Sequence, residues 1–255
     1  MVRDLVLLKK WCDSNFLTLN INKTNILRFK CNFGSISLES ITISNFQTNT
    51  FLGLYIDNKL KFDLHVTNLN RKLSQSCYAI RMVSRELSRE VAVSVYHTLF
   101  ESRVCYGLCF WGCCTESLFG SVFILQKRAI RIICKARQRD SCRPLFVSLG
   151  ILTLTSLFIL ETVCLVREKY KLEISQPSAY ATRHCDFKLR PIIPSSDLIK
   201  KSIIYNGKKL FNHLILHIRK IESKRQFRTA TKNILIGKAY YSVDEFFSDL
   251  APPQT

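Results

Sequence analysis

Hydrophobic and polar residues follow two different periods along this chain, and the period changes near residue 63. Before that point the segments 16–30, 35–44 and 50–57 alternate or run apolar over short stretches, which is typical of β-strands. Residues 2–14 differ, because their apolar side chains recur at the spacing of an amphipathic helix. The pattern therefore predicts a helix, a β-hairpin at 16–30 and two further strand-like segments.

Beyond residue 63 the pattern is helical and contains few helix-breaking residues. The apolar positions predict helices over the ranges 64–84, 88–108, 118–137 and 154–172. A linker-like stretch follows, and the two prolines of "RPIIPSSD" favour an irregular or extended backbone there. Close to the chain end, Ser242 precedes Glu245 by three residues, a spacing that is typical of a helix N-terminus.

These elements predict an α+β chain that is mostly α. Its 255 residues are enough for one large domain or two small ones with a buried core. Gly and Pro number only 8 and 6, so long structureless stretches are not expected. We predict four parts: a small strand region at 1–63, a helical bundle at 64–172, a linker at 173–190 and a basic segment at 191–250.

The chain is strongly basic, with 38 Lys and Arg against 19 Asp and Glu and a net charge of +19. Such an excess favours an anionic partner, either nucleic acid or an anionic membrane surface, although a merely basic surface is the alternative. The apolar run 151–160 is far shorter than the roughly 20 residues of a membrane span. Residues 3–10 are too charged for a signal peptide. We expect an intracellular protein, nuclear or cytoplasmic and not secreted, whose 11 cysteines are reduced.

The strongest local signal is the stretch 121–140. As a helix it would carry three cations on one stripe and two beside it: Lys127, Arg131 and Lys135, then Arg128 and Arg139. Most of its apolar residues fall on the other side, and no acidic residue lies between Gln126 and Arg139. Because an ordinary solvated face mixes both signs, we interpret this face as a contact for nucleic acid. An unspecialised basic surface and a membrane surface are the alternatives.

Candidate metal ligands are few. Two-metal phosphoryl transfer needs carboxylates held close together, and the nearest Asp pair is Asp57 and Asp63. We interpret these two residues as a turn after a strand and the start of a helix. His213 and His217 are four residues apart but lack the Glu of an H-E-x-x-H helix, so they predict a solvated helix face.

Three cysteines, Cys105, Cys109 and Cys113, would share one helical face. Zinc sites use closer cysteine pairs with further ligands, whereas a free Cys behaves as a small apolar residue. We therefore predict core packing for these cysteines and no metal site in the chain.

A series of short motifs runs in a fixed order along the chain, each of them weak alone. They are carried by Trp11, Asn15, Leu17, Leu19, Asn20, Lys23, Thr24, Phe29, Phe51–Gly53, Ile56, Asp57, His65, Tyr106, Gly107, Trp111, Gly112, Leu125–Arg128, Phe146, Leu149–Leu152, Tyr180, Thr182, Arg183 and Tyr241–Phe246. In this order and spacing the motifs resemble the C-terminal half of reverse transcriptases from non-LTR retrotransposons of the jockey type.

The resemblance implies a role for each part of the chain. Residues 1–63 would be the end of the palm, where Lys23 matches a lysine near the incoming nucleotide. Phe51, Leu52 and Gly53 resemble the primer grip, and the helices after residue 64 would form a thumb that holds the template–primer duplex. The metal-binding aspartates of the family would precede residue 1, so no catalytic residue is assigned here.

The function that the resemblance implies is that of a truncated reverse transcriptase (RNA-directed DNA polymerase) fragment without the catalytic aspartates. We expect it to bind an RNA and DNA template–primer duplex and to be inactive as a polymerase alone. No cofactor is expected in this chain, although Mg²⁺ is implied for the parent polymerase. Its partners would be the duplex and the missing N-terminal half of the polymerase, and no membrane. The alternatives are a non-enzymatic nucleic-acid-binding or interaction protein derived from the fragment, and an unfunctional translated relic.

Overall fold

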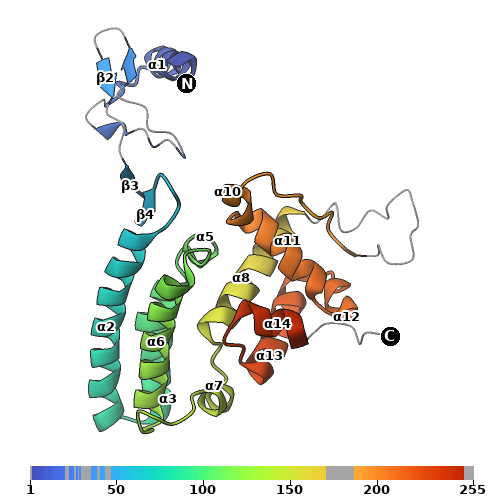
Figure 1. Ribbon diagram of the computed structural model, residues 1–255. Helices are drawn as coiled ribbons and strands as arrows, with labels where there is room; N and C mark the ends of the chain where they lie inside the picture. The colour runs from blue at the N-terminus through green and yellow to red at the C-terminus, as the bar shows by residue number, and fades with distance from the viewer. Residues whose placement is uncertain are drawn as a thin grey trace. The chain divides into compact units, whose positions relative to one another are not determined.

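The structure, a computed structural model, contains two compact units, Met1–His65 and Val66–Thr255, which are described separately below (Figure 1). It describes residues 2–20, 23–25, 27, 29, 36–38, 41–43, 47–170 and 187–249. Helices dominate these residues and two small antiparallel sheets accompany them, so the prediction of a mostly helical α+β chain is confirmed.

The first unit opens with helix α1 (Val2–Ser14), as the sequence predicts. Strands β1 (Ile36–Leu38) and β2 (Ile41–Ile43) form an antiparallel pair within the strand-like segment 35–44. The residues of that segment outside the two strands lie outside the described part of the chain.

The hairpin predicted at 16–30 is wrong as far as the structure describes this range, because residues 16–20 and 23–25 form no strand. The Asn20 side chain explains part of the difference. Its Oδ1 accepts a hydrogen bond from the Lys23 N–H at 3.1 Å, and the Thr24 hydroxyl donates to the Asn20 carbonyl at 2.8 Å. Such local bonds offer the backbone an alternative to a strand ladder.

The segment 50–57 is a hairpin and not one continuous strand. Strands β3 (Thr48–Phe51) and β4 (Leu54–Asp57) pair antiparallel through a two-residue turn. Leu52 and Gly53 form this turn with φ of 47° and 80°. Positive φ at both positions matches the right-handed twist of the strands, so the Gly within an apolar run marks a turn here.

The second unit is built from helices, of which α2 already begins in the first unit. They are α2 (Asp63–Glu86), α3 (Arg89–Val95), the π-helical turn η2 (Tyr96–Glu101), α4 (Ser102–Cys105), α5 (Leu108–Trp111), α6 (Glu116–Ile133), α7 (Arg143–Leu149), α8 (Leu154–Lys169), α10 (Asp197–Lys200), α11 (Ile203–His213), α12 (Leu216–Arg219), α13 (Lys224–Lys238) and α14 (Val243–Asp249). The predicted helices 64–84 and 154–172 correspond closely to α2 and α8.

Two details of these helices test the sequence patterns. The predicted helix 88–108 is interrupted at Gly107, whose φ of 64° is left-handed, and α5 starts after it. The predicted N-cap is confirmed, because the Ser242 hydroxyl accepts a hydrogen bond from the Glu245 N–H at 3.1 Å. The Glu245 carboxylate in turn accepts from the Tyr241 N–H at 2.9 Å.

Helix α8 is the centre of the second unit. Every residue from Leu154 to Leu160 is buried, and α11 and α13 pack along it (Figure 1). Ranges 66–170 and 191–249 therefore contribute to one compact unit, while the assignment of the predicted parts as thumb and extension stays a prediction. The buried Arg167 of α8 donates to the carbonyls of Ile221 and Glu222, both at 2.6 Å, and so ties the segment before α13 to α8.

Replacement of Gly207 by Ala should destabilise the fold by about 1–3 kcal/mol, because α11 approaches α8 too closely for a side chain. A Cβ at Gly207 would lie 2.2 Å from the Val166 Cγ2 and 3.1 Å from the Thr162 Cγ2. Gly120 in α6 is the control, because a Cβ there meets nothing within 4 Å. Ala at Gly120 should stabilise by about 0.5–1 kcal/mol. Urea unfolding of both variants measures the difference, and equal midpoints would contradict close α8–α11 packing.

Candidate nucleic-acid interface

Helix α6 ends earlier than the range 118–137 predicts, and this changes the geometry of the predicted cationic stripe. Its last residue is Ile133, and Lys135 has a left-handed φ of 52°. The Ala136 N–H donates to the Arg131 carbonyl at 3.0 Å and the Lys135 N–H to the Ile132 carbonyl at 3.2 Å. This is the Schellman arrangement that satisfies the last carbonyls of a helix. Lys135 and Arg139 therefore do not continue a stripe on α6, and that part of the prediction is wrong.

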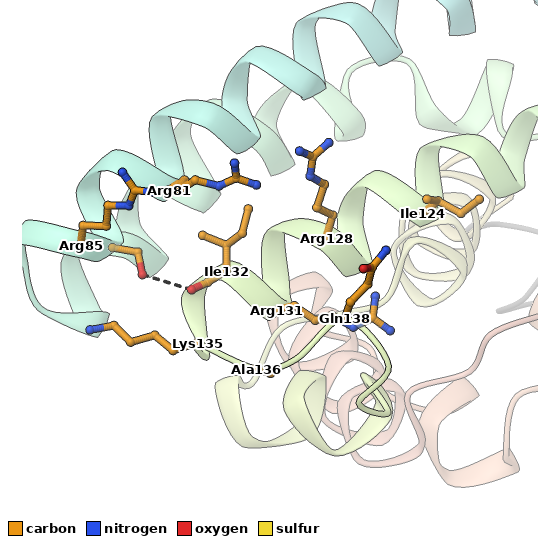
Figure 2. Close-up of a pocket in the computed structure, with 10 residues that line it drawn as sticks. Arg81, Arg85, Ile124, Arg128, Arg131, Ile132, Lys135, Ala136 and Gln138 are labelled. Atoms are coloured by element: carbon orange, nitrogen blue, oxygen red, sulfur yellow. Dashed lines mark hydrogen bonds between the residues drawn. The ribbon is translucent and has the colours of Figure 1, made fainter.

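A groove of about 900 Å³ lies between α2 and α6 and continues along the loop after α6. Figure 2 shows its two walls, with Arg81 and Arg85 on α2 and Arg128 on α6. The lining residues are Arg81, Ser84, Arg85, Ile124, Arg128, Arg131, Ile132, Lys135, Ala136 and Gln138. Five of these ten side chains are cationic and none is acidic, so the groove presents a concentrated positive charge.

Direct contacts fix how the two walls are aligned. Helices α2 and α6 run side by side in the same direction (Figure 1). Three bonds join them at successive levels: Asn70 Nδ2 to Ser121 Oγ at 2.7 Å, Cys77 Sγ to the Leu125 carbonyl at 3.6 Å and Ser84 Oγ to the Ile132 carbonyl at 3.1 Å. Residue 77 of one wall therefore stands level with residue 125 of the other, and residue 84 with residue 132.

The cations of the groove differ in how they are held. Arg131 donates through Nε and Nη2 to the Asp140 carbonyl at 3.2 and 3.0 Å, which folds the loop back toward α6. Among the described residues, no carboxylate pairs with Arg81, Arg85, Arg128 or Lys135. The positive potential extends to Cys77: burial raises the pKa of this thiol, and the charges of Arg128 and Arg81 act in the opposite direction.

Two of the five cations predicted from the sequence lie outside the groove. The Lys127 Nζ is 4.7 Å from the ring centroid of Phe123 and 5.6 Å from that of Tyr241, on another side of α6. Arg139 is exposed in the loop after α6 and is not among the lining residues. The role of both residues in nucleic-acid binding stays a prediction.

Sequence reasoning missed Arg81 and Arg85, which form the α2 wall. Their spacing of four residues on a predicted helix was a signal that their side chains share one face. The sequence does not show that this face meets Arg128, because that depends on α2 packing against α6. Beyond the end of the groove, Arg89 donates to the Cys134 sulfur at 3.1 Å beside a smaller pocket of about 290 Å³.

The residues that resemble the palm lie in the first unit. Lys23 is exposed at the turn built on Asn20. Phe51, Leu52 and Gly53 stand at the tip of the β3–β4 hairpin, where Phe51 is 62% and Leu52 74% exposed. These positions are open to a ligand, and their roles stay predictions.

Asp57 has a structural role. Its carboxylate accepts hydrogen bonds from the backbone N–H groups of Lys59, Lys61 and Phe62 at 2.7–3.1 Å, which closes the loop between β4 and α2. Asp63 begins α2, so the interpretation of this pair as a turn and a helix start is confirmed. In the described part of the chain, no three His, Cys, Asp or Glu residues are grouped to hold a metal ion.

The cysteines of the second unit pack at the boundary between helices. Cys109 accepts from the Thr162 hydroxyl of α8 at 3.9 Å, and the Cys113 sulfur accepts from the Asn206 side-chain amide of α11 at 3.6 Å. Burial raises the pKa of Cys105 and Cys113 to about 12 and that of Cys109 to about 11. These thiols remain protonated near neutral pH, as expected of packing residues. All nine described cysteines are free.

The prediction of a solvated face for the histidine pair is wrong for His213. This residue ends α11, and its ring lies 5.3 and 4.9 Å from the rings of Phe246 and Phe247 of α14. Burial lowers its pKa. His217 is exposed and belongs to α12, so the two histidines do not share a helix. His213 is covered by the two aromatic rings of α14. The residues next to His213 in the sequence do not indicate this contact.

Among the described helices, none alone is both long and apolar enough to cross a membrane. Helices α7 and α8, bent by 55° at the break between them, meet that criterion only as a pair.

The fold and the groove define a mostly helical α+β protein with a concentrated cationic surface, and comparison with known proteins adds a relationship. Over 150 residues, 54% of this chain, the sequence is 28% identical to the RNA-directed DNA polymerase from mobile element jockey of Drosophila melanogaster. The match covers 16% of that relative's length. No family model and no solved structure matches the sequence. The chain thus contains a region related to jockey-type reverse transcriptases of non-LTR retrotransposons.

Proposed function

We propose that this chain binds nucleic acid through the groove between α2 and α6, as the part of a reverse transcriptase that holds the template–primer. The observation that supports this proposal most directly is a groove lined by five cations and no acidic residue. Arginine and lysine side chains in such a site neutralise phosphates and release condensed counterions. The relative's name describes an RNA-directed DNA polymerase, an activity that requires contact with a template and a primer.

The proposed role is binding and not the chemistry of polymerisation. The groove offers charge along two helices, and among its lining residues only Gln138 and Ser84 carry neutral polar side chains. Contacts of this kind position a nucleic acid without specifying its sequence. A non-enzymatic nucleic-acid-binding protein derived from the same element would use the same groove. Primer extension by the purified chain would distinguish an active polymerase from such a protein and from an inactive fragment.

Salt titration of the purified full chain tests the proposal. Fluorescence anisotropy would follow binding to RNA–DNA hybrids of two unrelated sequences at rising KCl. We expect equal affinities for the two sequences and a slope of log K against log salt near −3.6, because four cations without a described acidic partner each contribute about −0.9, the B-form DNA value. Poly-glutamate is the control for an unspecialised basic surface. Absence of binding at low salt, or equal binding of poly-glutamate, would contradict the proposal.

A further inference from the structure

One exposed apolar side chain lines the groove, and an exposed Tyr that is not a lining residue lies on α2 near the arginines of the groove. Tyr78 of α2 is 65% exposed and Ile124 of α6 is 62% exposed. Ile124 is itself a lining residue of the groove, and Figure 2 shows it on the same helix as Arg128. Tyr78 precedes Arg81 by three residues, so the two side chains lie within about 60° of each other around α2. Most of the surface of both side chains is therefore open to solvent and is available to a ligand.

The alignment of the helices brings these two residues to the same level. The hydrogen bond from Cys77 to the Leu125 carbonyl joins the walls there. Tyr78 is one residue after Cys77 and Ile124 is one residue before Leu125, so their heights along the seam differ by only about 3 Å. The side chain of Tyr78 points about 100° away from that of Cys77, on the side of α2 that also carries Arg81 and Arg85.

The arginines follow at the next level along the same seam. Arg81 on α2 stands about one turn beyond Tyr78, and Arg128 on α6 about one turn beyond Ile124. Arg85 is about 6 Å further along α2, a rise comparable to the separation of neighbouring phosphates along a strand. Along the chain direction of both helices, Tyr78 and Ile124 therefore come first and the arginines come about one turn later.

We infer that this groove takes an unpaired strand of the template–primer, with one base held between Tyr78 and Ile124 and the neighbouring phosphates on the arginines beyond them. The inference rests on the proposed function and specifies which form of nucleic acid the site takes. In a duplex each base is covered by its neighbours, so a Tyr ring contacts a base face only where the strand is unstacked. Aromatic rings beside a cationic track are the arrangement that holds single strands without sequence preference.

An oligonucleotide without bases separates the clamp from the charges. Anisotropy would compare a strand of twelve thymidines with an abasic strand of equal length and charge, using the full chain. We expect the thymidine strand to bind about tenfold more tightly, because a stacked base adds to the phosphate contacts. Tyr78→Ala should bind both strands as weakly as the wild-type chain binds the abasic strand. Tyr78→Phe should retain the preference, and Ile124→Ala should reduce it.

Control variants distinguish failure of the Tyr78–Ile124 clamp from failure of the proposed function. Phe110→Ala removes another aromatic ring, 53% exposed on α5, and should leave the preference unchanged. Equal wild-type affinity for the two strands, or a preference that survives Tyr78→Ala, would overturn the clamp. In that case the proposed function still stands if Arg81→Gln and Arg128→Gln weaken binding of both strands. If these arginine variants, folded by circular dichroism, bind as the wild type does, both proposals fail.

Discussion

Replacement of Arg81, Arg85 and Arg128 together by Gln should weaken nucleic-acid binding by about a hundredfold at moderate salt. Each cation that neutralises a phosphate contributes about 0.9 to the slope of log K against log salt. Loss of three such contacts should therefore flatten the slope by up to about 2.7 on a B-form duplex and weaken binding by up to about 500-fold near 0.1 M salt. The loss should be the same for unrelated sequences, because phosphates carry no sequence information.

The three arginines suit this experiment because their removal should leave the fold intact. Arg85 and Arg128 are exposed, and none of the three pairs with a carboxylate in the described part of the chain. Gln forms helices about as well as Arg, so α2 and α6 should persist. Circular dichroism and a urea midpoint close to the wild-type value would establish that a loss of binding is not a loss of structure.

A control variant of equal net charge separates the groove from the general basicity of the chain. Lys188, Arg225 and Lys232 are exposed cations outside the groove lining, and their joint replacement by Gln removes the same charge. It should change the slope by much less than the groove variant does. Equal effects of the two variants would show an unspecialised basic surface, and an unchanged slope in the folded groove variant would place the contact elsewhere.

Replacement of Gln126 by Leu should destabilise the second unit by roughly 3–9 kcal/mol, a large part of the 5–15 kcal/mol typical of a whole domain. Gln126 is only 1% exposed. Its amide Nε2 donates to the Tyr96 hydroxyl at 2.9 Å and to the Leu152 carbonyl at 3.0 Å. Its Oε1 accepts from the Leu154 N–H at 2.7 Å, a donor that α8 cannot satisfy at its own first turn.

The size of this effect follows from what the variant leaves behind. Leu fills a similar volume but leaves a buried N–H, a carbonyl and a hydroxyl without their partner, at about 1–3 kcal/mol each. Urea unfolding measures the loss, and Gln226→Leu on the exposed side of α13 is the control, expected within about 0.5 kcal/mol of wild type.

A double-mutant cycle tests the assignment of this loss to unpaired polar groups. Tyr96→Phe should destabilise the wild-type chain but not the Gln126→Leu chain, where it removes a hydroxyl that has lost its partner. The same cost of Tyr96→Phe in both backgrounds would contradict the network.

The sequence predicted some of the cations of the groove but not their arrangement. The cationic character of the region around Arg128 and Arg131 was predicted, because no acidic residue accompanies those positions. Its geometry was not, since Lys135 takes a left-handed conformation after the end of α6 although no Gly marks that position. Lys127 lies over aromatic rings, and Arg131 binds the Asp140 carbonyl. A binding experiment should therefore replace Arg81, Arg85 and Arg128.

By itself, the sequence determined the features that depend on neighbouring residues: the helix pattern of α2 and α8, the cap at Ser242, the turn at Asp57 and the basic charge. Periodicity and short-range hydrogen bonds carry this information, because the interacting groups lie within a few residues. The tertiary structure alone decided which cations meet across the α2–α6 seam and that α14 covers His213. These contacts join residues far apart in sequence, and the packing of whole helices on one shared core determines them.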